Sequence, residues 1–82
     1  MERQIGRVTH YYGHLGVAAV ELEGELQAGD IIHIKGRTSD WVQKIEQIQL
    51  EHTDIDRALA GQIVGIKVTD HAREHDLVYL VE

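Results

Sequence analysis

The 82-residue sequence contains no cysteine, which excludes disulfide bonds and thiolate metal ligands. Its uninterrupted apolar runs, such as residues 17–20, are far too short to cross a membrane. The first residues lack the basic and then apolar pattern of a secretion signal. We therefore expect a soluble cytoplasmic protein, one domain over residues 1–82, whose small hydrophobic core alone carries the stability.

Positive charge is also scarce. Eight Lys and Arg residues stand against 14 Asp and Glu residues, which gives a formal net charge of -6, and no basic block occurs anywhere. Strong non-specific binding of nucleic acid depends on cations that displace counterions from phosphates. The charge balance therefore works against such binding.

Apolar residues recur at two-residue spacing in short runs bounded by Gly and Asp, a pattern typical of half-buried strands. About six strands are predicted, over residues 4–11, 17–22, 31–35, 41–50, 63–68 and 77–81. Within 41–50 the apolar residues fall three apart, which indicates a bulge or strong bend, although a short amphipathic helix fits the same spacing. Only residues 54–59 look helical.

One local pattern occurs at residues 28–32, 60–64 and 74–78, and each copy introduces a predicted strand. It predicts a tight turn whose central residue takes positive φ, followed by a polar residue that bonds to the local backbone. The central residues are Gly29, Gly61 and His75. Because glycine suits positive φ best, the His75 turn either has a different geometry or is strained.

Reused turns of this kind favour an all-β fold, which we predict to be a closed or nearly closed Greek-key β-barrel of about six strands. Closure would remove the exposed edges of a small open sheet. The predicted core consists of Val8, Ala18, Val20, Ile32, Ile34, Ile45, Ile48, Val64, Ile66, Val68, Val78 and Leu80.

Several segments resemble the second domain of translational GTPases, the β-barrel of elongation factor Tu and its relatives. The matching segments are residues 6–8, 16–18, 26–36 (Leu-Gln-Ala-Gly-Asp-Ile-Ile-His-Ile-Lys-Gly), 42–48 and 58–66 (Ala-Leu-Ala-Gly-Gln-Ile-Val-Gly-Ile). The resemblance covers nearly the whole chain. It implies a translation-associated binding module that contacts tRNA, ribosomal RNA or a ribosome-associated partner.

The phosphate-binding loop Gly-x-x-x-x-Gly-Lys-[Ser/Thr] is absent, so the GTPase activity of the neighbouring domain in that family does not transfer. No nucleotide or other cofactor is expected. No nucleophile lies in a recognisable motif with a base, so the chain is predicted not to be an enzyme. Six histidines are present, but no third ligand is fixed by spacing near His71 and His75, and no metal site is predicted.

Cations and aromatic rings supply the candidate nucleic-acid contacts, which are Arg7, Tyr11, Tyr12, Lys35, Arg37, Lys44 and Lys67. Alternatively, the tyrosines cover the barrel end and the surface, and the cations pair with acidic neighbours. A second hypothesis is a protein-docking or self-assembly module without RNA binding, with Tyr12 and Trp41 as candidate interface residues. Trp41 either plugs the barrel mouth or marks such an interface.

Overall fold

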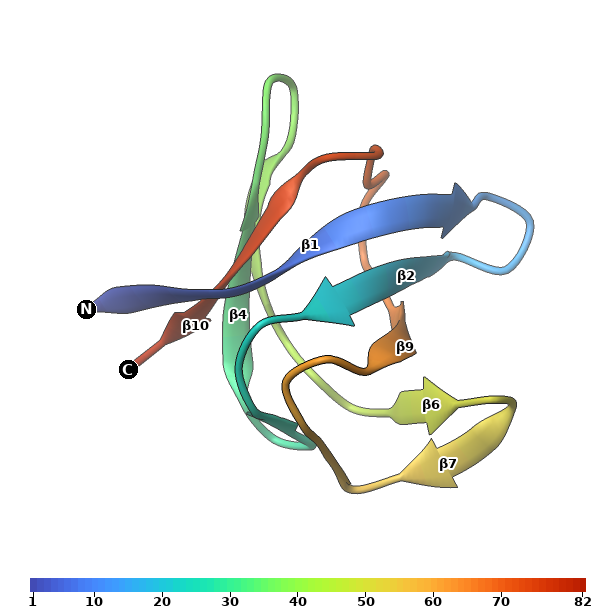
Figure 1. Ribbon diagram of the computed structural model, residues 1–82. Helices are drawn as coiled ribbons and strands as arrows, with labels where there is room; N and C mark the ends of the chain where they lie inside the picture. The colour runs from blue at the N-terminus through green and yellow to red at the C-terminus, as the bar shows by residue number, and fades with distance from the viewer.

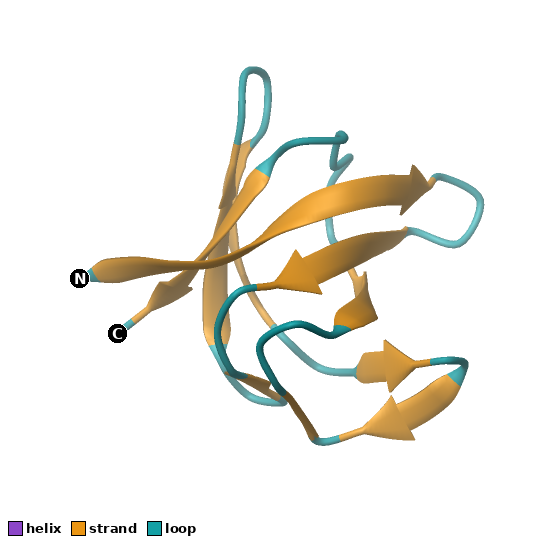
Figure 2. Ribbon diagram, viewed as in Figure 1, coloured by secondary structure: helices purple, strands orange, loops and turns teal.

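The computed structural model describes all residues from Met1 to Glu82, and every regular element in it is a β-strand (Figure 2). The all-β class is therefore confirmed. The strands are β1 (Glu2–Tyr12), β2 (Val17–Leu22), β3 (Leu26–Gln27), β4 (Ile31–Lys35), β5 (Asp40–Lys44), β6 (Ile48–Leu50), β7 (Thr53–Ile55), β8 (Arg57–Ala58), β9 (Ile63–Lys67) and β10 (Leu77–Val81).

Eight strands form one antiparallel sheet in the order β5-β4-β10-β1-β2-β9-β6-β7, while β3 and β8 pair separately. The large sheet curls around the core (Figure 1). Its edge strands, β5 and β7, do not pair with each other, so the sheet does not close. Of the predicted closed or nearly closed barrel, the closed form is therefore wrong.

The sheet stays open because of the segment between β5 and β6. β5 pairs with β4, whereas β6, which follows after three intervening residues, pairs with β9. Between β5 and β9 the contact is made by the buried side chain of Gln43, whose Nε2 donates to the carbonyl oxygen of Lys67 at 2.9 Å. The expected bend within residues 41–50 is thus confirmed, and the helical alternative is wrong.

The helical turn expected at residues 54–59 is also wrong, because β7 and β8 occupy this segment. Ile55 lies opposite Ile48 of β6, and Ala58 lies opposite Leu26 of β3. Ile55 packs against the core and Ala58 is part of it. Pairing with neighbouring strands outweighs a helical preference of little more than one turn.

The repeated turn has the predicted geometry in all three copies. The central residues have φ values of 98° at Gly29, 92° at Gly61 and 76° at His75. In each copy the next residue accepts, through a side-chain oxygen, the backbone N–H three positions earlier, at 2.9 Å for Asp30, 2.8 Å for Gln62 and 2.9 Å for Asp76. His75 therefore has the same backbone geometry as the two glycines, and it carries the strain that positive φ imposes on a residue with a Cβ atom.

The core is one cluster of 16 buried residues, and the predicted core residues belong to it except Leu80, which is only partly buried. The alternation of inward and outward side chains along each strand explains most of this core. In β2, for example, Ala18, Val20 and Leu22 all face inward. Ile5 was not predicted because a bulge between Gln4 and Gly6 breaks the alternation of β1. The other unpredicted members are Leu22, Leu26, Ala58 and Ala72.

A membrane-crossing helix requires a long apolar stretch of helix, and the structure contains none.

Candidate functional site

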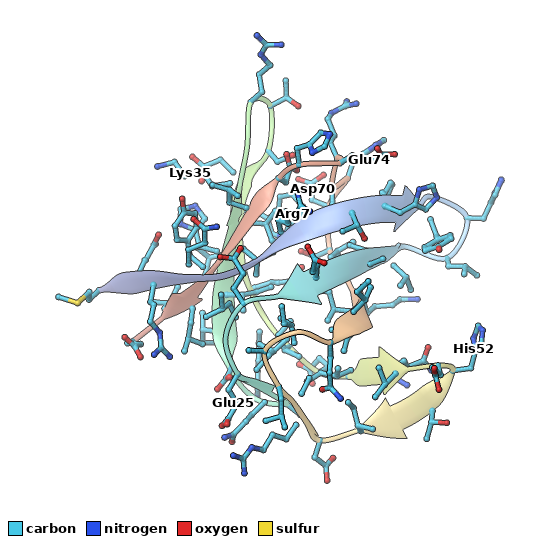
Figure 3. The ribbon with its side chains drawn as sticks, in the orientation of Figure 1. Arg7, Glu25, Lys35, His52, Asp70 and Glu74 are labelled. Carbon is cyan, nitrogen blue, oxygen red and sulfur yellow. The ribbon has the colours of Figure 1, made fainter.

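The cations singled out in the sequence do not form one patch. Lys35 and Arg7 lie opposite Leu77 from either side of β10, and Arg7 is paired with Glu21 at 3.0 Å (Figure 3). Arg37 lies in the turn after Lys35, whereas Lys44 lies at the other end of the β4–β5 hairpin, opposite Ile31. Lys67 is on β9, two strands beyond β1.

The candidate aromatic residues take different positions. Tyr11 packs against the core, and its ring lies 4.4 Å from that of His71. Tyr12 points outward and remains 46% exposed. Trp41 also packs against the core, and its Nε1 donates to Oε1 of Gln43 at 2.9 Å. A role of Tyr12 or Trp41 in an interface stays a prediction.

The histidines do not gather into a metal site, since no cluster of three or more His, Cys, Asp or Glu side chains has a suitable arrangement. The imidazole of His33 is instead held between two carboxylates. Nδ1 lies 2.7 Å from Oε2 of Glu2, and Nε2 contacts Oδ1 of Asp40. The contact with Asp40 and then that with Glu2 raise the pKa of His33. With both ring nitrogens engaged, this imidazole is an ion-pair partner rather than a free base.

An exposed groove lies on the outer face of β2 and β9. It consists of two hollows of about 290 and 230 Å³ that share Leu15, Val17, Gln49 and Gly65. We call it the β2–β9 groove. Its apolar lining comprises Tyr12, Leu15, Val17, Ala19, Ile63 and Val64, with Gly65 at its centre.

Strand register explains why this face is hollow. Ala19 lies opposite Gly65, and Gly65 lies opposite Gln49, so the smallest side chains of β2 and β9 sit side by side. Residues directly opposite each other point to the same face of a sheet. Larger side chains at Tyr12 and Ile63 flank this floor.

The polar wall of the groove is held in place by one carboxylate. Oδ1 of Asp54 accepts hydrogen bonds from Nε2 of Gln47 at 2.8 Å and from Nε2 of Gln49 at 3.0 Å. These hydrogen bonds, with that from Gln49 the stronger influence, lower the pKa of Asp54. Because both amide nitrogens are directed to Asp54, the orientation of both side chains is fixed.

Two features define the ends of the groove, a hydrogen bond at one end and a hairpin turn at the other. Nζ of Lys67 donates to the carbonyl oxygen of Leu15 at 3.1 Å, which ties the β1–β2 loop to β9. Glu51 and His52 form the tip of the β6–β7 hairpin and have positive φ values of 51° and 66° (Figure 3). Positive φ at both central residues is the geometry that a two-residue hairpin turn requires.

Most groove residues were not identified from the sequence. Ile63 carried a usable signal, since the inward phase of Val64 and Ile66 places it outward on the same strand. Leu15 was not singled out, since an apolar residue in a loop has no period to mark its direction. Gln47, Gln49 and Asp54 gave no signal, because their connection depends on the β6–β7 hairpin.

No protein-family model matches the chain. Among curated proteins it is 39% identical over 80 residues to an uncharacterized protease of Methanocaldococcus jannaschii, covering 96% of this chain and 20% of the relative. It is also 39% identical over 77 residues to a collagenase of Porphyromonas gingivalis, covering 92% of this chain and 21% of the relative. The chain thus spans about a fifth of the length of these relatives.

Among solved structures, the chain matches the C-terminal domain of a candidate U32 peptidase of Geobacillus thermoleovorans with a TM-score of 0.90 and 26% identity. The match covers 95% of this chain and 91% of that chain. The selenomethionine variant of the same domain matches with a TM-score of 0.88.

These findings correct the predicted family and function. The resemblance to the second domain of translation elongation factors is wrong, because the matching proteins are named protease, collagenase and U32 peptidase. The predicted RNA-binding translation module is therefore wrong as well. The Leu-x-x-Gly-Asp-x-Ile and Ala-Gly-x-x-Val pieces encode a turn that precedes a strand, so they report local backbone geometry.

The prediction that the chain is not an enzyme is overturned as well, because relatives at 39% identity are named as proteolytic enzymes. In sequence and in fold, this chain is similar to the C-terminal domain of a candidate U32 peptidase.

Proposed function

We propose that this chain acts as a peptidase-associated domain of the U32 type, which works together with the larger catalytic part of such an enzyme. The observation that carries the proposal is the match to an isolated U32 C-terminal domain over 95% of this chain at a TM-score of 0.90. The 39% identity to a collagenase, over 92% of the chain, supports the same kinship.

The contribution of the domain to proteolysis is made through the β2–β9 groove. A groove with an apolar floor and a few oriented polar groups is the usual form of a binding site. Here Gly65 and Ala19 provide the floor, and Gln47 and Gln49 provide polar groups fixed by Asp54.

A domain replacement tests this function. In the Porphyromonas gingivalis collagenase, the 77 aligned residues are either deleted or replaced by the corresponding part of this chain. Cleavage of fluorescein-labelled gelatin is then measured, with thermal unfolding as the control for folding. We expect the deletion to lower cleavage at least tenfold and the replacement to recover most of it.

A third protein, in which an unrelated β domain of equal length fills the same position, separates a specific contribution from simple covering of the catalytic part. Equal recovery with the unrelated domain would refute the proposal. So would a folded replacement that cleaves gelatin no faster than the deletion.

A further inference from the structure

We propose that the β2–β9 groove binds an extended polypeptide segment in which apolar side chains alternate with basic ones. This inference rests on the proposed function and specifies the substrate class that the groove receives. It is carried by the shape, the hydrogen-bonding groups and the charge of the site.

Three large apolar side chains around the groove are exposed. Leu15 is 62% exposed, Ile63 is 54% exposed and Tyr12 is 46% exposed, and all three border the same hollow. An apolar patch with polar groups at its rim marks a binding surface. The two adjoining hollows extend across β2, β9 and β6, which suits an elongated ligand rather than a compact one.

The polar wall complements a polypeptide backbone. Gln47 and Gln49 each donate their Nε2 group to Asp54, so their Oε1 atoms remain as acceptors. A polypeptide in extended conformation presents backbone N–H groups at regular spacing, and side chains to alternate faces. N–H groups can therefore bond to the glutamine oxygens while every second side chain enters the apolar hollow.

The charge of the domain favours a basic ligand. The formal net charge is -6, and Glu51 lines the groove itself. Lys67, the cation in the lining, borders the hollow of about 230 Å³, whereas Glu51 borders the hollow of about 290 Å³, which no Lys or Arg lines. A chain with this negative field attracts positively charged segments and repels acidic ones.

The position of the chain ends leaves the groove open. Both termini lie together at the side of the fold opposite the β1–β2 loop and the β6–β7 hairpin (Figure 1). A covalent connection through either end therefore enters away from the groove.

Fluorescence anisotropy with the isolated chain tests the inference. The probe is a fluorescein-labelled peptide of eight to ten residues, in the range of about one strand, in which valine alternates with lysine. Two comparison peptides carry serine in place of valine or glutamate in place of lysine. We expect saturable binding of the valine–lysine peptide and at least tenfold weaker binding of both others.

The protein variants are Leu15→Ser and Ile63→Ser, alone and combined. Both side chains are more than half exposed, so the variants are expected to fold. The matched control is Val42→Ser, since Val42 is 57% exposed on β5 and lies outside the groove. The double variant should bind the peptide at least tenfold more weakly, whereas the control should bind it as the unchanged chain does.

Absence of saturable binding would overturn the inference. The inference would also be overturned if the serine–lysine peptide bound as tightly as the valine–lysine peptide, or if the double variant bound the valine–lysine peptide as tightly as the unchanged chain. In either case the apolar side chains would contribute nothing to binding, and the attraction would be purely electrostatic. The two proposals fail separately: a replacement that restores gelatin cleavage without peptide binding refutes only this inference. Peptide binding without restored cleavage refutes only the proposed function.

Discussion

The side chain of Gln43 connects to Lys67 where the backbone ladder is missing, with Nε2 donating to the carbonyl oxygen of Lys67 at 2.9 Å. Its Oε1 accepts from the backbone N–H of Thr69 at 3.0 Å and from Nε1 of Trp41 at 2.9 Å. One buried amide thus satisfies groups from two segments that no strand pairing joins. It thereby connects β5 with β9 and Thr69 across the opening of the sheet, which we call the seam.

Replacing Gln43 with methionine, which has a similar length but no such polar groups, should lower the free energy of unfolding by about 2–3 kcal/mol. The cause is the loss of partners for the carbonyl of Lys67 and the N–H of Thr69. Urea unfolding followed by Trp41 fluorescence measures the change. Gln4→Met, at an exposed glutamine, is the control and should change stability by less than about 0.5 kcal/mol. Equal effects of the two variants would contradict the role of the seam.

The ion pairs of His33 predict a pH dependence of stability. Because the folded pKa of His33 is raised above its usual value of 6.5, its contribution is fully present below pH 6.5 and is lost as pH rises through the folded pKa. The pKa of Asp40 is lowered from 3.8 by its hydrogen bond to His33, so that contribution is present above pH 3.8 and is lost as pH falls through the folded pKa.

We therefore expect the stability difference between the unchanged chain and His33→Gln to be largest between about pH 4 and 6.5 and to shrink above it. Melting temperatures measured from pH 4 to 9 test this, with His14→Gln as the control at an exposed histidine. A difference that stays constant up to pH 9 would show that packing, and not the ion pairs, explains the effect of His33.

The third copy of the repeated turn offers a stabilising substitution. His75 has a φ of 76°, and its side chain is exposed. His75→Gly should raise stability by up to about 1 kcal/mol, because glycine takes positive φ without strain. His75→Ala keeps the Cβ atom and should not stabilise. An equal gain from both substitutions, measured by thermal unfolding, would mean that the ring rather than the backbone is unfavourable.

A close approach at Gly36 predicts the opposite effect. A Cβ atom at this position would lie 1.9 Å from Oδ1 and 2.6 Å from Cγ of Asp76. Asp76 cannot yield easily, because it is buried and its Oδ2 accepts the N–H of Arg73. Gly36→Ala should therefore cost about 1–3 kcal/mol. Gly13→Ala, where the nearest atom is 3.6 Å away, is the control and should be close to neutral.

Local sequence patterns predicted the local structure well. The spacing at Ile32 and Ile34 identified a strand and its inward face, and the Ala-Gly-Asp and Ala-Gly-Gln pieces identified the turns at Gly29 and Gly61. These features depend on alternation and on the φ preference of glycine, which act within a few residues. The short strands β3, β7 and β8 were missed because three residues or fewer carry no readable period.

The groove was harder to predict because it is a product of long-range register. Ala19 and Gly65 are ordinary strand residues in the sequence, and they become a floor only where β2 and β9 lie side by side. The fixed glutamines likewise require β6 to turn back into β7 at Glu51 and His52. The family was misidentified for the related reason that turn motifs report backbone geometry and not ancestry.

The pairing of β1 with β10 has a mechanical consequence. Met1 and Glu82 are joined by two hydrogen bonds, of 3.1 Å from the N-terminal nitrogen of Met1 and 2.8 Å from the backbone N–H of Glu82. Since these strands run antiparallel, a tension applied at the two ends loads the ladder one rung at a time, like a zipper opened from its free end. The β1–β10 ladder should therefore separate at a low force when the chain is pulled by its two ends.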